Sequence, residues 1–258
     1  MENDKKISYS HLTNELDTLE GGTALTRDLD TVEGRTAPWA QKTLMRNVYG
    51  WMSLALAITG LMAYYVGSNL SLVEALFSNQ ALYWGLWIAE LALVWILSAR
   101  IERLSFATAG VMFGVYSLLN GVLISSIFVV YTMDSIASTF FITAGMFASM
   151  AVIGTVMKKD LSGYGRFFMM ALIGLIIASV VNIFLQSTGL DWIVSIVGVL
   201  LFTALTAYDA QKIKRMFLNA DSESDIMRKY ALLGALSLYL DFINLFLYLL
   251  RFFGNRRD

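Results

Sequence analysis

The sequence has no cysteine, a single proline and a single histidine, and only 15% of its 258 residues are charged. Without cysteine the chain has no disulfides, no thiolate metal sites and no cysteine nucleophile, and it offers no cysteine pattern from which to infer a redox compartment. The lone His11 does not supply the several ligands that a metal site needs. The net charge of −1 shows no basic excess, which argues against a nucleic-acid partner.

Apolar residues are abundant: they make up 57% of the sequence, and its mean hydropathy is +0.61. Soluble domains contain roughly 45–50% apolar and about 25% charged residues, so the composition predicts an all-α polytopic membrane protein. We expect a flexible cytoplasmic tail over residues 1–46, one membrane domain over 47–254 and a short C-terminal tail over 255–258. Because residues 1–40 are polar throughout, we expect no cleavable signal peptide and insertion directed by the first span.

Seven apolar runs follow the tail, each long enough to cross a hydrocarbon core of about 30 Å as a helix. The sixth is the weakest, because it is short and ends on a charge. The predicted spans cover residues 48–66, 81–97, 106–131, 136–157, 167–186, 192–208 and 230–250.

The charges of the connecting segments orient these spans. Residues 67–80, 132–135 and 187–191 contain no Lys or Arg, whereas the alternating connections do. The positive-inside rule therefore places the N-terminus in the cytoplasm. Seven crossings put the C-terminus outside. The three arginines at 251, 256 and 257 conflict with this placement, because the positive-inside rule favours arginines on the cytoplasmic side. Either these are tolerated outside or the last segment re-enters; we favour a full crossing, since the run is long enough.

Three carboxylates lie inside the predicted spans: Glu90, Asp209 and Asp241. An ionised aspartate at the centre of a bilayer costs roughly 2.5–3.5 kcal/mol on insertion scales, so Asp241 needs a partner, a proton or water. Asn244 follows three residues later and lies on the same helical face. These residues predict a polar site within the last span.

Asp209 and Asp241 lie on consecutive helices joined by one connection and can face each other. Two close carboxylates in a low dielectric do not readily ionise together, so they share a proton, and once deprotonated they offer hard oxygen ligands for Ca²⁺. The depths differ, however, since Asp241 lies about 11 residues, roughly 16 Å, into its predicted helix, while Asp209 lies near the end of its own. Contact requires tilted helices or an earlier start of the seventh; otherwise Asp209 is interfacial.

Glu90 lies in mid-span and calls for a cation or a proton. The cations that the sequence offers are Arg251, which would form a gate between two helices, and Arg100, about three turns along the same helix. The alternative is a protonated Glu90 that contacts a carbonyl group or water.

Four segments of the chain have recognisable motifs. Residues 235–254 are ALSLYLDFINLFLYLLRFFG, residues 205–213 are LTAYDAQKI and residues 157–162 are MKKDLS. The fourth segment contains Glu90-Leu and the stretch Ser98-Ala-Arg-Ile101. In this order they resemble the C-terminal signature, the sixth-helix motif, the exit of the fourth helix and the second helix of the Bax inhibitor, or transmembrane Bax inhibitor motif, family. The resemblance covers residues 45–254.

The resemblance implies a bacterial inner-membrane protein with seven helices, the last of them central. It also implies a pH-sensitive Ca²⁺ leak in which Asp209 and Asp241 titrate together and hold the ion transiently. In the family this pair is linked to an arginine at the end of the second helix, for which Arg100 and Arg103 are the candidates. The expected partners are membrane lipid, protons and Ca²⁺ as the permeant ion, with no cofactor and no nucleic acid.

Two other functional classes are compatible with parts of the sequence. Relatives in this family are similar to modulators of membrane proteases and to stress or cell-death regulators, and residues 1–40 would then be the region that contacts the partner. Two membrane aspartates are also the requirement of an intramembrane aspartyl protease. That class carries Gly-x-Gly-Asp and a proline-containing motif, whereas this chain has Leu-Tyr-Leu before Asp241 and no proline after it, so we expect no enzyme.

Overall fold

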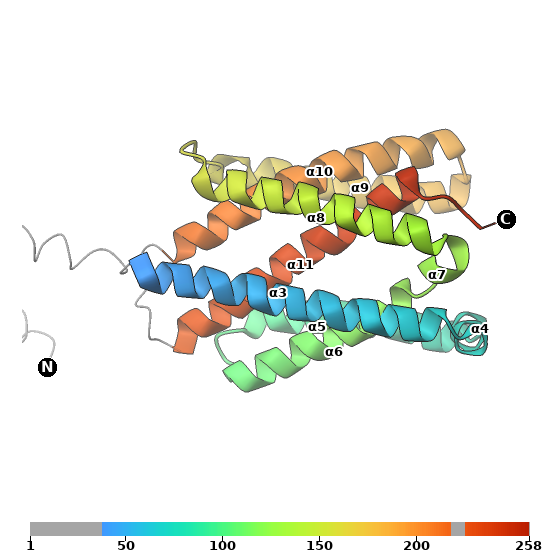
Figure 1. Cartoon of the computed structure of the whole chain (residues 1–258), viewed down its shortest axis with the longest axis horizontal. Helices are drawn as coiled ribbons and strands as arrows, with labels where there is room; N and C mark the ends of the chain where they lie inside the picture. The colour runs from blue at the N-terminus through green and yellow to red at the C-terminus, as the bar shows by residue number, and fades with distance from the viewer. Residues whose placement is uncertain (1–37, 218–224, 258) are drawn as a thin grey trace, which may run out of the picture.

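A computed structural model describes residues 38–217 and 225–257 of the chain, and this part is built from α-helices (Figure 1). Polar side chains mark several helix starts, because an oxygen there accepts a hydrogen bond from an otherwise unpaired backbone N–H. Ser105, Thr132 and Ser187 accept such bonds at the starts of three long helices. The elements are α3 (Pro38–Gly67), α4 (Leu70–Ser78), α5 (Gln80–Arg100), α6 (Phe106–Ile124), α7 (Ile127–Val130), α8 (Met133–Val156), the short 3-10 helix η1 (Ser162–Tyr164), α9 (Gly165–Leu185), α10 (Thr188–Met216) and α11 (Asp225–Phe253).

Seven helical segments within the described residues are long and apolar enough to span a membrane, in agreement with the seven predicted spans. The largest differences are in α10, which contains 29 residues, and in α3, which contains 30. α10 continues past the predicted end at 208 to Met216, because its last turns bury Ala210, Gln211 and Ile213 even though charged residues lie between them. The short helix α4, between the first two spans, was not predicted.

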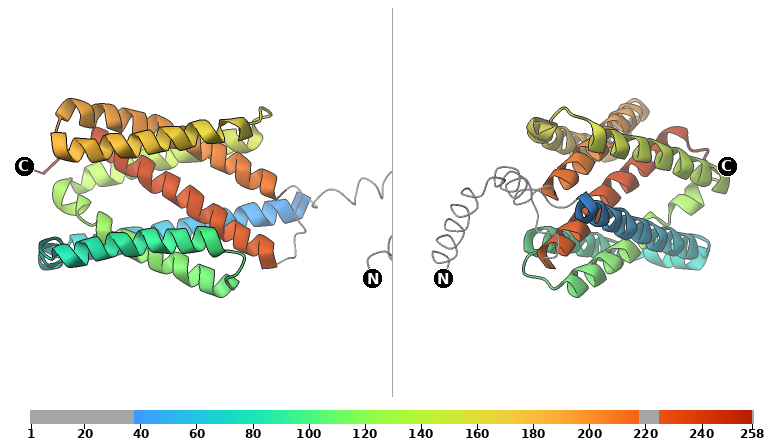
Figure 2. Two further views of the ribbon diagram at one scale, coloured as in Figure 1. Left: turned by 180° about the vertical axis from the view of Figure 1, so that it is seen from behind. Right: turned by 60° about the vertical axis from the view of Figure 1, so that its left-hand side comes forward.

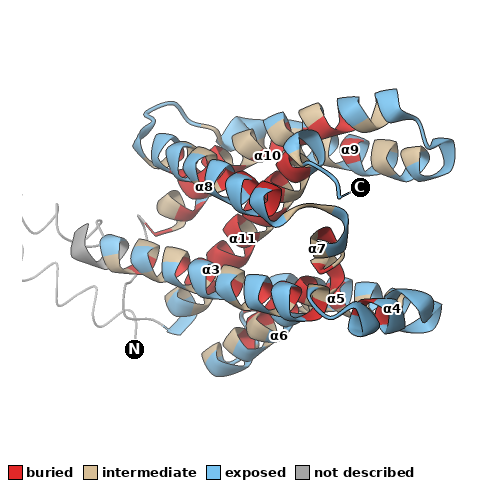
Figure 3. Cartoon of the chain, turned by 45° about the vertical axis from the view of Figure 1, so that its right-hand side comes forward, coloured by how far each residue is buried: buried red, intermediate tan, exposed pale blue. Residues whose placement is uncertain are grey.

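The last helix is central. In the most apolar stretch of α11, 67% of the residues are buried, against 11% in the corresponding stretches of α5 and α9. α11 runs diagonally between a group formed by α3, α5 and α6 and a group formed by α8, α9 and α10 (Figures 1 and 2). Its buried residues appear as the red band at the centre of Figure 3.

The outer surface of the bundle is apolar. Large side chains such as Phe141, Met170 and Phe184 are 73%, 73% and 83% exposed. Because a soluble protein rarely exposes contiguous apolar surface on this scale, this surface faces lipid.

The two ends of the bundle differ in charge. We call the end at which α3, α6, α9 and α11 begin the basic end, since α5 ends there on Arg100 and the connections there contain Arg103, Lys158 and Lys159. α11 runs from this end to the opposite end, so the last apolar segment crosses fully (Figure 1). Beyond α11, the Asn255 carbonyl accepts a hydrogen bond from the backbone N–H of Thr132 at 3.1 Å, which ties the C-terminal residues to the start of α8.

The first helix begins before the first predicted span. Helix α3 starts at Pro38, and proline suits a first helical turn, where N–H groups have no intrahelical partner. The start of the membrane domain at residue 47 stays a prediction. Residues 1–37, which make up most of the predicted tail and of the predicted partner-contact region, lie outside the described residues.

Candidate functional site

Asp241 lies in the middle of α11 and is only 5% exposed. Its neighbours along the helix, among them Leu238, Phe242 and Leu245, are buried as well. The Oδ2 atom of Asp241 is buried and has no hydrogen-bond partner among the described residues. Since an unpaired buried polar atom costs about 1–3 kcal/mol or more, this carboxyl group is an energetic exception within a well-packed helix.

Asp209 lies on α10, the helix that packs most extensively against α11. Its side chain is half-buried and lies beside the side chain of Ser237, one turn before Asp241 on α11. The charge of Asp209 acts directly on Asp241, and Lys212 adds a positive charge on the solvent side of Asp209. The structure thus brings the two carboxylates together into one site, which we call the aspartate pair.

The tilt of α11 removes the difference in depth that the sequence indicates. From Asp209, α10 continues for about two turns to Met216, whereas α11 begins about four turns before Asp241. Two helices parallel to each other would leave these residues at different depths. α11 crosses the bundle diagonally (Figure 1), and its residue Asp241 comes close enough to Asp209 of α10 for their charges to interact.

The other residues predicted near the pair lie elsewhere. Asn244 donates from Nδ2 to the carbonyl of Leu240 on its own helix at 2.8 Å, so its amide is engaged within α11. The side chains of Arg100 and Arg103 are exposed, and neither forms an ion pair within the described part of the chain. The structure therefore does not join either arginine to the aspartate pair.

Glu90 forms a second buried carboxyl site, on the opposite side of α11. It is 5% exposed, and its carboxyl group lies beside the Asn120 side chain of α6. Asn120 also lies beside the Tyr116 hydroxyl group. Glu90 Oε1 and Asn120 Oδ1 are buried without a hydrogen-bond partner among the described residues, so this cluster too is only partly satisfied.

Tyr239 of α11 extends the Glu90 cluster towards α3. The Tyr116 and Tyr239 rings meet edge to face with centroids 5.8 Å apart. The Tyr239 hydroxyl group lies 2.6 Å from Thr59 Oγ1. Because Thr59 Oγ1 donates its only hydrogen to the Ser117 carbonyl at 2.8 Å, the Tyr239 hydroxyl group is the donor to Thr59.

The predicted pair of Glu90 and Arg251 does not form in this structure. Arg251 lies at the opposite end of the bundle, where its Nη1 atom is 3.3 Å from Asp191 Oδ1 of α10. The diagonal course of α11 explains why Glu90 and Arg251 do not meet. The first turns of α11 lie beside the end of α5, and its last turns lie beside α10 (Figure 2). Glu90 and Arg251 are thus on helix segments that diverge.

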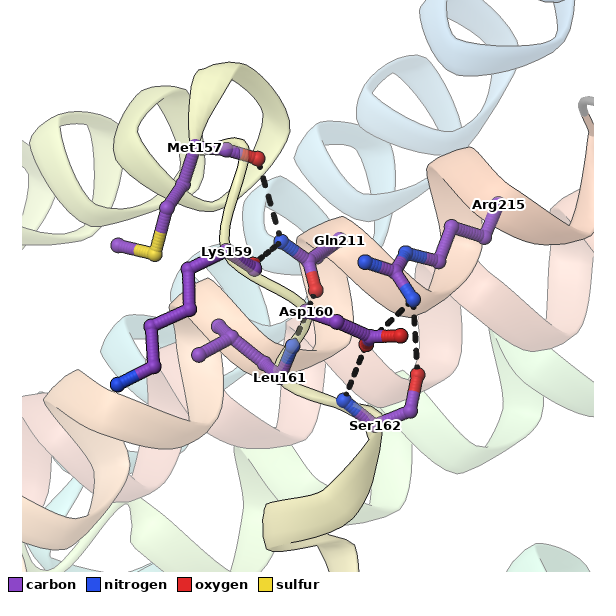
Figure 4. A network of polar contacts seen from close by, with 7 residues as sticks. All are labelled: Met157, Lys159, Asp160, Leu161, Ser162, Gln211 and Arg215. Atoms are coloured by element: carbon purple, nitrogen blue, oxygen red, sulfur yellow. Dashed lines mark hydrogen bonds and ion pairs between the residues drawn. The ribbon is translucent and has the colours of Figure 1, made fainter.

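A polar clamp joins the connection between α8 and α9 to the end of α10, close to Asp209 (Figure 4). The buried Gln211 accepts a hydrogen bond from the backbone N–H of Leu161 at 2.8 Å and donates one to the Lys159 carbonyl at 2.9 Å. Arg215 forms an ion pair with Asp160 and donates to Ser162 Oγ at 3.0 Å. The Arg215 guanidinium is the main reason why the pKa of Asp160 lies well below its usual range. The N–H and hydroxyl groups of Ser162 lower this pKa further.

Sequence reasoning missed the clamp and the Thr59–Tyr239 link. Gln211 and Arg215 lie four residues apart on one helical face, next to a connection containing Asp160, and this spacing is a signal that could have indicated the clamp. Nothing comparable marks Tyr239, because a tyrosine in an apolar run is ordinarily a packing or interfacial residue.

The described residues contain no group of three or more His, Asp or Glu side chains able to hold a metal ion. The aspartate pair offers two carboxyl groups, fewer than the six to eight oxygen ligands that Ca²⁺ takes. An ion at this pair would complete its coordination with water or backbone carbonyl groups.

Comparison with known proteins places this architecture in a family. The family model described as inhibitor of apoptosis-promoting Bax1 matches residues 41–258. The chain belongs to this Bax inhibitor family. It is 52% identical over 217 residues to the inner membrane protein YbhL of Escherichia coli K12, an alignment that covers 84% of this chain and 93% of that protein.

Two further relatives show how widely the Bax inhibitor family extends among bacteria. An uncharacterized protein of Borreliella burgdorferi is 43% identical over 84% of this chain and 96% of its own length. The protein RP147 of Rickettsia prowazekii is 41% identical over 83% of this chain and 90% of its own. The protein is therefore a multi-pass membrane protein of this family, in agreement with the family resemblance of its motifs.

Proposed function

We propose that the protein is a pH-sensitive leak channel for Ca²⁺, gated by the proton shared between Asp209 and Asp241. The observation that carries the proposal is the placement of Asp241, 5% exposed, with an unpaired Oδ2 atom, beside a second carboxylate on the neighbouring helix. Ionisable groups in a membrane interior are costly and commonly mark ion or proton pathways.

The proposed gate is the contact between α10 and α11. With one proton shared, the carboxyl groups attract each other and the two helices stay packed. When the number of protons on the pair changes, the balance of charge between the helices changes with it, since like charges at short range in a low dielectric repel strongly. Gly198 of α10 packs directly against the Tyr248 ring of α11, so a change at the pair alters a contact farther along the same helices.

The choice of Ca²⁺ rests on the ligands that line the proposed path. The aspartate pair supplies carboxylate oxygens, and cysteine is absent from the chain. Hard cations such as Ca²⁺ prefer oxygen ligands.

The proposed location is a bacterial inner membrane with the basic end in the cytoplasm. The basic connections support this orientation through the positive-inside rule, and a relative 52% identical to this chain is named an inner membrane protein. In this orientation the aspartate pair is nearer to the cytoplasmic side, and Arg251 is at the outer side.

Flux through purified protein in liposomes tests the proposal. With a Ca²⁺ indicator inside, the flux at pH 6 and pH 8 should differ for the wild type. Asp241→Asn and Asp209→Asn remove the titrating groups at almost constant size, so both should bring the ratio of the two fluxes close to one. Asp134→Asn, which changes an exposed acid in the first turn of α8, is the matched control and should keep the wild-type ratio.

Two outcomes would contradict the proposal. Wild-type liposomes with no Ca²⁺ flux above empty liposomes would exclude the channel. Asparagine variants that retain the wild-type pH ratio would exclude the aspartate pair as the sensor, even if flux itself persisted.

A further inference from the structure

A large groove runs along the lipid-facing side of the bundle between α3 and α8. Its volume is about 1070 Å³, slightly more than the roughly 300–1,000 Å³ of pockets that bind drug-sized ligands. Both helices pack against α11, which lies between them in Figure 3. Phe242 of α11 lines the groove and directly follows Asp241.

Small side chains leave the groove open. Ala57 and Gly60 of α3 face Ala144, Ala148 and Ala151 of α8 across it. A Cβ atom added at Gly60 would meet nothing within 4 Å. The lining is otherwise almost entirely apolar, with aromatic rings from Phe147 and Phe242. Its occupant must therefore present a long hydrocarbon surface.

The basic end of the groove carries two cations. Lys42 of α3 and Lys214 of α10 both line it. Lys214 Nζ donates to the Thr155 carbonyl of α8 at 2.7 Å, and Thr155 also lines the groove. This contact holds the ammonium group at the mouth of the groove. An apolar slot with lysines at one end is complementary to a molecule with an anionic head and an apolar tail.

The groove is long enough for an extended acyl chain. From Lys42 to Leu61 of α3 it runs for roughly 28 Å along the helix axis, which is most of an about 30 Å hydrocarbon core. Basic pockets between transmembrane helices are known binding sites for anionic lipid head groups. We infer that this groove binds an anionic phospholipid of the leaflet at the basic end, with its phosphate group at Lys42 and Lys214 and an acyl chain between α3 and α8.

This inference does not depend on channel activity, and binding measurements test it directly. Full-length protein is delipidated in mild detergent, titrated with phosphatidylglycerol, phosphatidylcholine or glycerol phosphate, and examined by native mass spectrometry. We expect one phosphatidylglycerol to bind at least about tenfold more tightly than phosphatidylcholine, because two cations face the head group. Glycerol phosphate, which has no acyl chain, should neither bind nor compete.

Variants separate the groove from the general lipid surface. Ala148→Trp fills the groove and should abolish the binding of phosphatidylglycerol. Ala92→Trp, at an exposed residue of α5 outside the groove lining, should leave this binding unchanged. Ser53→Trp fills the same space from α3 and replaces Ala148→Trp if that variant fails a thermal-unfolding control. Lys42→Gln and Lys214→Gln should each weaken binding about fivefold, and Arg166→Gln, at an exposed cation of the same end outside the groove lining, should leave it unchanged.

Three results would overturn the inference. Equal binding of both phospholipids, with no effect of either lysine variant, would show ordinary lipid contact. Competition by glycerol phosphate would indicate a site for a soluble phosphate. A dimer in the wild type that Ala148→Trp dissociates would show that a second copy of the chain covers the groove.

Discussion

At the scale of single residues, three of the four buried side-chain atoms that have no hydrogen-bond partner among the described residues belong to the two carboxyl sites beside α11. Tyr239 and Asp241 are two positions apart and so point to roughly opposite sides of the helix. The Tyr239 side meets Thr59 and the Glu90 cluster, and the Asp241 side meets Asp209. One central helix therefore carries two carboxyl sites at similar depth without bringing them into contact.

Gly154 controls how closely α8 approaches α10 near the aspartate pair. A Cβ atom at this position would collide with the carbonyl group of Ala207, two residues before Asp209. Since the obstacle is backbone, Gly154→Ala must move a helix, and we expect a loss of about 1–3 kcal/mol in the free energy of unfolding. Gly145→Ala on the same helix meets nothing within 4 Å and should change stability by less than about 1 kcal/mol. Equal unfolding transitions of the two variants in detergent would contradict this packing.

The residue types at the site were predictable, but only some of their partners were. Asp241 stands out because a charge inside a long apolar run is costly. Glu90 stands out for the same reason, yet the sequence offered it a cation, whereas the structure gives it the amide of Asn120. Arg251 has its partner in Asp191. Such choices depend on which helix ends are neighbours, and that depends on helix tilts that a single sequence does not encode locally.

At the scale of elements, the spans were predictable because membrane thickness sets their length. The error was in α10, whose apolar run ends at the residue before Asp209 although the helix continues to Met216. Its last turns are stabilised by contacts from a different part of the chain, such as the hydrogen bonds of Gln211 to residues 159 and 161. A pattern of local hydropathy contains no information about such contacts.

The clamp at the end of α10 should be insensitive to pH in the range in which the aspartate pair is proposed to act. Because the folded-state pKa of Asp160 lies below its ordinary value, the ion pair with Arg215 contributes fully above the unfolded pKa of about 3.9. This contribution is lost only as the pH falls towards the folded pKa. Hydrogen exchange of the Ser162 amide, which donates to Asp160 Oδ1 at 2.7 Å, should therefore keep a constant protection factor from pH 5 to pH 8 and lose protection below about pH 4.

The neighbouring Leu161 amide is the internal control. It donates to Gln211 Oε1, which does not titrate, so its protection should persist at acid pH for as long as the bundle stays folded. If Ser162 lost protection between pH 5 and pH 8, the clamp would itself be a pH sensor, and pH-dependent flux could not be assigned to the aspartate pair alone.

At the scale of the whole molecule, the charges at the two ends give conflicting signals that the structure helps to reconcile. Arg251, Arg256 and Arg257 lie at the opposite end from the basic connections, since α11 crosses fully. Arg251 is paired with Asp191, and the backbone N–H of Arg257 donates to the Val130 carbonyl at 2.9 Å. These contacts hold the C-terminal residues against the bundle. The orientation is then judged from the basic connections, which favour a cytoplasmic basic end by the positive-inside rule.

The absence of cysteine makes this orientation directly measurable, because any introduced cysteine is unique in the chain. Glu74, in α4 at the opposite end, and Lys158, between α8 and α9 at the basic end, are both exposed. In intact bacterial cells whose outer membrane has been permeabilised, a membrane-impermeant maleimide should label Glu74→Cys. It should label Lys158→Cys only after the inner membrane is opened, and it should leave the wild-type chain unlabelled. The reverse pattern would place the basic end outside, and then the aspartate pair would sense the pH of the external medium rather than that of the cytoplasm.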